Sequence, residues 1–292
     1  MDLSGIYPPI ATPFADDEID YTGLRRNVGR WMATGLRGLL ALGSNGEAAF
    51  LDEDESERIV ATVRADVPRD RVLLAGAGRQ STRATIAAVK RAAGAGADAV
   101  LVLTPFYFKA RMTHEALVDH YRAVADASPV PVLLYNFTSV TGLNMSLETV
   151  AALSAHPNII GMKDSNGDVA QAAGIVARVP ADFTLLVGSA GTLHPSLLAG
   201  AAGAIVAVAN VVPDVCVRLF ELARAGRHDE ARRLQERLTP LALAVTREFG
   251  VAGLKAAMEI AGYVGGPVRL PLRPVGTDER EELRRLYEQL KE

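Results

Sequence analysis

Lys163 is the residue of this chain whose type and position are best suited to covalent chemistry. It ends an apolar run that begins at Asn158, and polar residues follow it directly. Such a run is typical of a buried parallel strand, and the carboxyl ends of these strands open onto ligand sites. The free amine of a lysine there can attack a carbonyl carbon and form a Schiff base. A lysine that reaches solvent and pairs with Asp164 or Asp168 is the alternative.

Alternation along this strand predicts which side chains accompany the lysine. Successive residues of a strand point to opposite faces, so Ile159 and Gly161 are expected on the face of Lys163 and Met162 on the other face. The missing side chain of Gly161 would then leave room beside the long stem of the lysine.

Tyr135 ends the preceding apolar run, and a segment with helical spacing, residues 147–156, separates it from the strand of Lys163. A strand, helix, strand unit makes its two strands parallel and usually adjacent. Because adjacent strands lie about 4.8 Å apart, we expect the Tyr135 hydroxyl to approach the Lys163 amine. A phenol beside a Schiff base can transfer protons to and from a substrate. A tyrosine that caps the core with its hydroxyl in water is the alternative.

The elements that would position these residues alternate between short apolar runs and amphipathic stretches. The predicted strands end near Pro9, Leu42, Gly76, Leu103, Tyr135, Lys163, Val187 and Val206. Eight such alternations predict an α/β fold of the (β/α)8 TIM barrel type. After residue 225 the pattern is helical only, so we predict a catalytic barrel over residues 1–225 and a C-terminal helical bundle over residues 226–292.

Composition excludes several classes of function. The 292 residues are 49% hydrophobic and 22% charged, which is typical of a globular enzyme. A net charge of -3 gives no electrostatic reason to expect nucleic acid or an acidic membrane as partner. No apolar run is long enough to cross a bilayer, and the N-terminus lacks a basic segment followed by an apolar one. We therefore expect a cytoplasmic location.

Neither a metal site nor a dinucleotide site is indicated. The histidines are scattered outside the strand ends, and we expect each to face solvent or to cap a local element: they are His114, His120, His156, His194 and His228. The single cysteine, Cys216, lies among apolar residues and is predicted to be a small core residue. The glycines at 76 and 78 lack the third glycine of a dinucleotide-binding turn.

The ends of the other predicted strands carry further candidate binding groups. The second strand ends in residues 43–47, GSNGE, where glycines permit a tight turn whose N–H groups could hold a carboxylate. Tyr107 follows the fourth strand and is expected on the same rim. Small residues at 188–191 and 209–211 are compatible with a phosphate or carboxylate site. Close packing is favoured there because neither segment contains a lysine or an arginine.

Taken together, these segments resemble a known family. The chain is similar over nearly its whole length to the pyruvate-type class I aldolases, which include dihydrodipicolinate synthase and N-acetylneuraminate lyase. The segments that carry the resemblance are GSNGE at 43–47, Tyr135-Asn136, Thr141-Gly142 and GMKDS at 161–165. Within the family the chain is most similar to 4-hydroxy-2-oxoglutarate aldolase, because of Ser44-Asn45 in place of two threonines, the segment 107–112 and the segment 262–267.

The resemblance implies a role for each residue. Lys163 would form the Schiff base and Tyr135 would transfer protons, while Ser44 and Asn45 would bind the substrate carboxylate. Tyr107 would complete the proton relay across a subunit interface of a homotetramer built as a dimer of dimers. The remaining residues of the expected substrate-binding set are Gly46, Ser165, Gly188 and Val206. No metal and no cofactor is implied, and the expected partner is a small 2-oxo acid.

Two positions depart from the family pattern. Dihydrodipicolinate synthases usually have an arginine shortly before the Thr-Gly pair, where this chain has Val140. A valine cannot form an ion pair with a second carboxylate, so synthase activity is disfavoured. Thr138 replaces a common proline and leaves the shape of that loop open.

The expected reaction is a retro-aldol cleavage of a short 4-hydroxy-2-oxo acid, 4-hydroxy-2-oxoglutarate, to pyruvate and glyoxylate. A dehydratase or aldolase that acts on a sugar-derived 2-keto-3-deoxy acid would use the same Schiff base. Two different classes remain as alternatives: a metal-free sugar-phosphate isomerase, which predicts a strong phosphate site, and a non-catalytic ligand-binding barrel.

Overall fold

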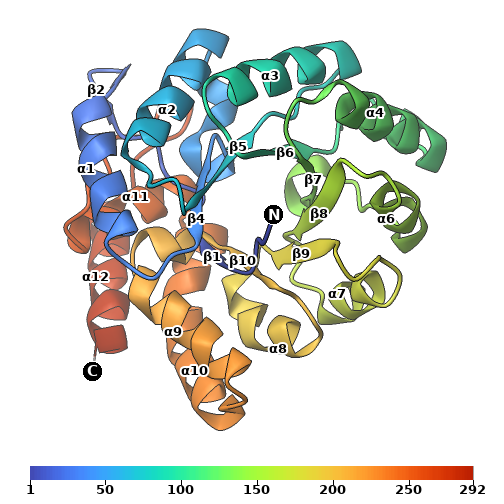
Figure 1. The fold of residues 1–292 in the computed structure, drawn as a ribbon. Helices are drawn as coiled ribbons and strands as arrows, with labels where there is room; N and C mark the ends of the chain where they lie inside the picture. The colour runs from blue at the N-terminus through green and yellow to red at the C-terminus, as the bar shows by residue number, and fades with distance from the viewer. Residues whose placement is uncertain (292) are drawn as a thin grey trace.

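Eight parallel strands form the centre of the molecule, which we describe from a computed structural model over residues 1–291. The strands are β1 (Gly5–Tyr7), β4 (Gly38–Ala41), β5 (Val72–Gly76), β6 (Ala99–Leu103), β7 (Val132–Asn136), β8 (Ile159–Asp164), β9 (Thr184–Val187) and β10 (Gly203–Ile205). Each strand pairs with its neighbours in the order β1-β10-β9-β8-β7-β6-β5-β4. The two ends meet where the Ile10 N–H donates to the Leu40 carbonyl at 2.9 Å and the Leu40 N–H donates to the Pro8 carbonyl at 3.0 Å. The predicted barrel is therefore confirmed (Figure 1).

Helices surround this barrel (Figure 1). They are α1 (Tyr21–Met32), α2 (Glu53–Asp66), α3 (Thr82–Gly94), α4 (His114–Ala127), α5 (Thr138–Thr141), α6 (Leu147–Ser154), α7 (Val169–Val176), α8 (Leu193–Leu198) and α9 (Pro213–Arg224). Side-chain caps begin several of them: Asp52 accepts from the Glu55 N–H in a capping box at α2, and Ser81 and Thr113 cap α3 and α4. Such caps satisfy N–H groups that a helix leaves unpaired, so these helices begin where the sequence changes from turn to periodic pattern.

A short antiparallel hairpin was not predicted. It pairs β2 (Phe14–Ala15) with β3 (Glu18–Ile19) before α1. Its turn residues Asp16 and Asp17 have positive φ values of 51° and 66°, as a tight hairpin turn requires. Aspartate signals such a turn less strongly than glycine does, so the local pattern does not reveal it.

The predicted faces of β8 are partly wrong. Ile159 pairs with Val132 and Gly161 pairs with Leu133, so Ile160 is an extra residue in the ladder. This irregularity resets the alternation. As a result Ile159 packs with Met162 between barrel and helices, whereas Ile160 faces the barrel interior.

Gly161 has a different role from the one predicted. A Cβ atom on Gly161 would lie 2.5 Å from the Thr184 carbonyl oxygen, so the glycine allows β9 to approach β8 closely. It does not make room beside the lysine stem.

The C-terminal helices pack together, and the segment after α11 (Gly250–Ile260) packs against the first helix of the barrel. The C-terminal helices are α10 (His228–Leu243), a single π-helical turn, η6 (Ala244–Glu248), α11 and α12 (Thr277–Lys291). Tyr263, which follows α11, stacks on Trp31 of α1 with ring centroids 5.5 Å apart. The boundary between residues 225 and 226 stays a prediction, and residue 292 lies outside the described residues.

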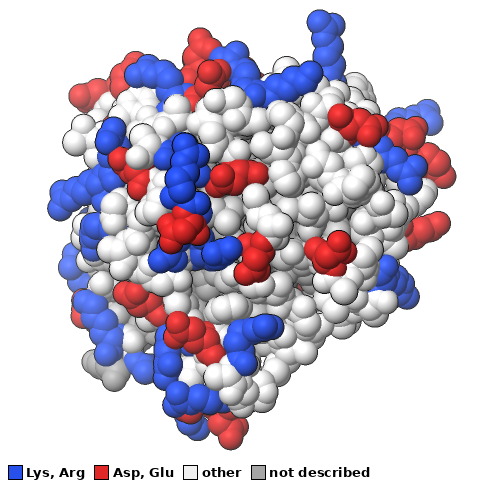
Figure 2. All heavy atoms as spheres, in the orientation of Figure 1, with Lys and Arg blue, Asp and Glu red and all other residues white. Residues whose placement is uncertain are grey.

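The surface carries both signs of charge. Lysine, arginine, aspartate and glutamate side chains are interspersed on the face shown in Figure 2. None of the helices within residues 1–291 is long and apolar enough to cross a membrane. Cys216 is buried among apolar neighbours, as predicted, and burial raises the pKa of its thiol to about 12.

Candidate active site

Lys163 and Tyr135 meet at the carboxyl ends of β8 and β7. The two residues are direct partners in the parallel ladder. The Lys163 amine donates to the Tyr135 hydroxyl at 3.3 Å, and the side chains are only 4% and 5% exposed. The predicted approach of the two groups is confirmed.

No carboxylate among residues 1–291 pairs with the Lys163 amine. Asp164 is buried and accepts from the Asn136 amide at 3.0 Å. Asp168 caps α7 and accepts from two backbone N–H groups at its start. The alternative in which either aspartate pairs with Lys163 therefore does not apply.

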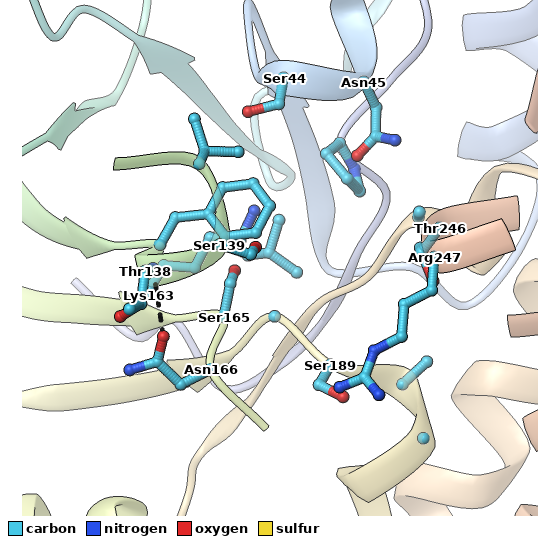
Figure 3. A pocket seen from close by; sticks show the side chains of 18 of the residues that line it. Ser44, Asn45, Thr138, Ser139, Lys163, Ser165, Asn166, Ser189, Thr246 and Arg247 are labelled. Atoms are coloured by element: carbon cyan, nitrogen blue, oxygen red, sulfur yellow. Dashed lines mark hydrogen bonds between the residues drawn. The ribbon is translucent and has the colours of Figure 1, made fainter. Parts of the chain in front are cut away.

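A cavity of about 870 Å³ opens above this pair. Six of the predicted site residues line it, namely Lys163, Tyr135, Ser44, Asn45, Ser165 and Gly188. Lys163 and Tyr135 end β8 and β7, and Ser44 and Asn45 belong to the turn after β4. Ser165 follows β8 and Gly188 follows β9. Figure 3 shows Ser44 and Asn45 together on one wall, with Lys163 and Ser165 on another. Residues far apart in the sequence thus face one space.

Gly188 provides the room beside the lysine that the alternation pattern assigns to Gly161. A Cβ atom on Gly188 would lie 1.9 Å from the Ser165 hydroxyl oxygen and 3.0 Å from the Lys163 Cε atom. Any larger residue would displace one of these two side chains. A glycine is therefore required for Lys163 and Ser165 to occupy the same wall.

Ser44 and Asn45 begin a tight 3₁₀ turn, η1 (Ser44–Gly46). The Gly46 N–H donates to the Gly43 carbonyl and the Glu47 N–H donates to the Ser44 carbonyl, which forms this turn. The N–H groups of Ser44 and Asn45 have no backbone acceptor within residues 1–291. They are available to an anion at the cavity wall.

Gly46 itself does not line the cavity, and its place in the substrate-binding set stays a prediction. Its carbonyl accepts from the Thr12 hydroxyl at 2.8 Å, and a Cβ atom there would lie 2.9 Å from the Ile10 carbonyl oxygen. Gly46 faces the segment after β1, and the close approach of that segment explains the glycine.

Val206 also lies outside the cavity. It is fully buried in the apolar layer between barrel and helices, whereas its neighbours Ile205 and Ala207 line the cavity. Alternation at the end of β10 turns the side chain of residue 206 outward.

The chain matches the model of the dihydrodipicolinate synthetase family over residues 2–290. It belongs to this family. A probable mitochondrial 4-hydroxy-2-oxoglutarate aldolase of Emericella nidulans is 38% identical over 98% of this chain and 94% of its own length. A 4-hydroxy-tetrahydrodipicolinate synthase of Xanthomonas campestris is 39% identical over 94% and 90%. The solved dihydrodipicolinate synthase of Thermotoga maritima superimposes with a TM-score of 0.95 at 31% identity, over 100% of this chain and 99% of that one.

Membership of the dihydrodipicolinate synthetase family makes the protein an enzyme of the class I aldolase and lyase type. The relatives carry both aldolase and synthase names, so the family alone leaves the substrate open.

Tyr107 does not reach the cavity of its own chain. Its side chain is 76% exposed and packs edge-to-face on Phe108, which is 69% exposed. The Gln80 side chain holds this segment by accepting from the backbone N–H groups of Phe106 and Tyr107 at 2.9 Å. A role for Tyr107 in a dihydrodipicolinate synthetase family site would need a neighbouring subunit, and it stays a prediction.

The outer wall of the cavity was not predicted. Thr246 and Arg247 line it from η6 (Figure 3). Val251 lines it from α11. Their sequence is purely helical and lies outside the barrel, so no local signal associates them with the site. Only the fold of the C-terminal helices brings them there.

The prediction for the histidines is wrong at two positions. His120 and His194 are buried rather than solvent-facing. His120 pairs with the Thr82 hydroxyl at 3.0 Å, and burial lowers the pKa of its imidazole to about 4. Both are absent from the cavity wall. Within the described part of the chain, no group of three or more His, Cys, Asp or Glu side chains is placed to hold a metal ion.

Proposed function

We propose that this enzyme cleaves 4-hydroxy-2-oxoglutarate to pyruvate and glyoxylate through a Schiff base on Lys163. The observation that carries the proposal is the 3.3 Å contact between the Lys163 amine and the Tyr135 hydroxyl at the base of the cavity. An amine with no carboxylate partner and a phenol beside it are the groups that imine formation and proton transfer require. The similarity to a probable 4-hydroxy-2-oxoglutarate aldolase supports the choice of substrate.

In this mechanism the Lys163 amine adds to the C2 ketone and gives a carbinolamine. Tyr135 donates its proton to the carbinolamine hydroxyl and water leaves, which forms an iminium ion and leaves Tyr135 as a phenolate. Tyr135 then takes the proton from the C4 hydroxyl, and the bond between C3 and C4 breaks. The electron pair of that bond moves into the iminium and gives an enamine, while glyoxylate departs. Protonation of the enamine at C3 and hydrolysis of the imine release pyruvate and restore the amine.

The remaining wall residues would orient the substrate. Ser44 and Asn45, which line the cavity and whose N–H groups have no backbone acceptor within residues 1–291, would hold the C1 carboxylate. Ser165 would contact the iminium region, since its hydroxyl and the Lys163 stem are both packed around Gly188.

Synthase activity is less well supported. Val140 lines the cavity and offers no cation to the carboxylate of aspartate semialdehyde. Arg247 on the outer wall is a cation that the strand-end pattern does not reveal. Efficient condensation of aspartate semialdehyde with pyruvate would mean that such a residue supplies the missing charge.

A sugar-derived 2-keto-3-deoxy acid is the second candidate substrate. The cavity is large, and polar side chains line its outer part, namely Thr138, Ser139, Asn144, Asn166 and Gln171. These groups could bind the hydroxyls of a longer chain. Cleavage or dehydration of such a substrate would proceed through the same imine.

A substrate panel tests the proposal. We expect 4-hydroxy-2-oxoglutarate to give pyruvate and glyoxylate at a kcat/KM above that for any 2-keto-3-deoxy sugar acid or for condensation of aspartate semialdehyde. Loss of water without glyoxylate, with a much higher kcat/KM on a sugar acid, would overturn the aldolase assignment.

We also propose that the chain forms a homotetramer, a dimer of dimers, in the cytoplasm. The exposed aromatic pair Tyr107 and Phe108 supports an interface at this rim, because large aromatic residues are enriched in such contacts. Light scattering of the purified enzyme should give the mass of four chains, and a monomer at working concentrations would contradict this.

A further inference from the structure

We propose that Arg247 binds the second anionic group of the substrate and so selects dianionic 2-oxo acids over monoanionic ones. This inference rests on the proposed function and extends it to the far end of the cavity. Arg247 belongs to η6, and its side chain lines the same cavity as Lys163. Figure 3 shows it extending from the C-terminal helices along the wall that also carries Ser189.

The charges of the cavity wall favour an anion at this end. Among the lining residues within 1–291, the charged side chains are Lys163, Arg247 and Asp168. Lys163 would be consumed as the imine, and one carboxylate oxygen of Asp168 already accepts from two N–H groups of α7. Arg247 is thus the cation that the wall offers to a group beyond C2.

Arg247 has no partner of its own in the described chain. Neither a hydrogen bond nor an ion pair joins its guanidinium to residues 1–291, although other arginines of the C-terminal helices, such as Arg232 and Arg280, are paired. An arginine presents several N–H donors in a planar arrangement that matches a carboxylate in two parallel hydrogen bonds. Its donors are therefore available to a ligand.

Arg247 lies within the π-helical turn that joins α10 to α11. An extra residue in a turn rotates all later residues of the helix by about 100° around its axis. Thr246 contributes to the turn by donating its hydroxyl to the Ala242 carbonyl at 2.6 Å. Residues before, within and after the turn line the cavity, among them Leu243, Arg247 and Val251. Such turns interrupt helices at a cost in regularity and occur often at functional sites.

Arg247 is a solvent-exposed residue on this wall. Water screens its attraction for an anion, so paired hydrogen bonds from the guanidinium, rather than desolvation, would carry the selectivity. A substrate held by Ser44 and Asn45 at C1 and by Lys163 at C2 would place its far carboxylate on the side of Arg247.

Binding of two matched ligands tests this inference without requiring turnover. 2-Oxoglutarate and 2-oxopentanoate share a five-carbon chain. The far end is a carboxylate in 2-oxoglutarate and a methyl group in 2-oxopentanoate. Titration calorimetry would give their Kd values for the wild type, Arg247→Gln and Arg233→Gln. Arg233 is an exposed arginine of α10 outside the cavity, so it is a matched control for the loss of one surface charge.

We expect Arg247→Gln to weaken 2-oxoglutarate binding by roughly 10- to 100-fold, the value of hydrogen bonds to a charged group. Binding of 2-oxopentanoate should change by less than about twofold, and Arg233→Gln should affect neither ligand. Equal losses for both ligands, no loss for 2-oxoglutarate, or equal affinities in the wild type would each overturn the inference. Arg247→Lys keeps the positive charge, so it should recover part of the preference for 2-oxoglutarate over 2-oxopentanoate. This variant keeps the test decisive if Arg247→Gln is poorly folded.

A separate experiment tests the Schiff base on which the proposed function depends. Cyanoborohydride with 2-oxoglutarate should add a reduced adduct at Lys163 in the wild type and in Arg247→Gln at saturating ligand. Absence of that adduct would contradict the Schiff base, whereas the ratio of the two Kd values reports on Arg247 alone.

Discussion

The amine of Lys163 donates to the hydroxyl of Tyr135 at 3.3 Å, and the two residues face each other across neighbouring strands. This relationship results from the topology, since the helix between β7 and β8 makes them parallel neighbours with their carboxyl ends at one rim. The same register pairs Asn136 with Asp164 one residue further on. The reactive pair is therefore held by backbone pairing rather than by flexible loops.

Removal of the Tyr135 hydroxyl should impair proton transfer. We expect Tyr135→Phe to lower kcat/KM by about 100- to 10,000-fold, the usual contribution of a positioned acid or base. The ring would remain, with its stacking on Phe137, so thermal unfolding should change little.

Tyr7→Phe is the matched control. It removes a buried phenolic hydroxyl that donates to the Leu3 carbonyl in the barrel interior, outside the cavity wall. Its activity should stay near that of the wild type. Comparable activity losses in the two variants would argue against a specific role for Tyr135.

Hybrid oligomers test the proposed role of Tyr107. Tyr107→Phe should lower kcat while leaving fold and assembly intact, because the side chain is exposed in its own chain. Mixtures with inactive Lys163→Ala subunits should regain activity, since some sites would combine wild-type Tyr107 from one subunit with wild-type Lys163 from another. If mixtures under exchange conditions never exceed the separate variants, Tyr107 does not act across an interface.

A buried ion pair ties the Ser44-Asn45 turn to the C-terminal helices. Glu47 follows this turn and lies 2.5 Å from the Lys255 amine of α11, and both side chains are almost fully buried. Lys255→Met would leave the Glu47 carboxylate without its cation, which should reduce the free energy of unfolding by about 3–5 kcal/mol.

The double variant Glu47→Gln with Lys255→Met should recover most of that loss in urea unfolding, because no unpaired buried charge remains. Arg232→Met, which breaks the exposed pair with Glu236, should cost less than about 1 kcal/mol. Equal costs for Lys255→Met and Arg232→Met would contradict the account.

Asp164 should make stability depend on pH. Burial raises the pKa of its carboxyl to about 6, against an ordinary value of 3.8. Because the folded state retains a proton that the unfolded state has lost, the contribution is favourable below about pH 4 and is lost as pH rises to about 6. Asp164→Asn keeps an acceptor for Asn136 and cannot ionise.

The free energy of unfolding of Asp164→Asn should therefore rise relative to that of the wild type between pH 4 and pH 7, by at most about 3 kcal/mol. Urea unfolding at a fixed protein concentration measures this difference. The exposed control Asp182→Asn should show no comparable trend. A difference that stays flat for Asp164→Asn would show that its carboxyl titrates normally.

The sequence was sufficient for the features that depend on local pattern and common topology. Eight apolar runs predicted the barrel, and the crossover between Tyr135 and Lys163 predicted their contact, because both result from parallel strands ending at one rim. The bulge at Ile160 could not be predicted, since the extra residue is visible only in the pairing with β7. Arg247 was missed for a similar reason: its place on the cavity wall depends on how distant helices pack.

Trapping of the imine tests the central claim most directly. Borohydride added with pyruvate should inactivate the enzyme, and peptide mass spectrometry should find one reduced pyruvyl group on Lys163. Lys163→Ala should show neither activity nor label. Labelling of a different lysine, or full activity of Lys163→Ala, would contradict the assignment of Lys163 as the nucleophile.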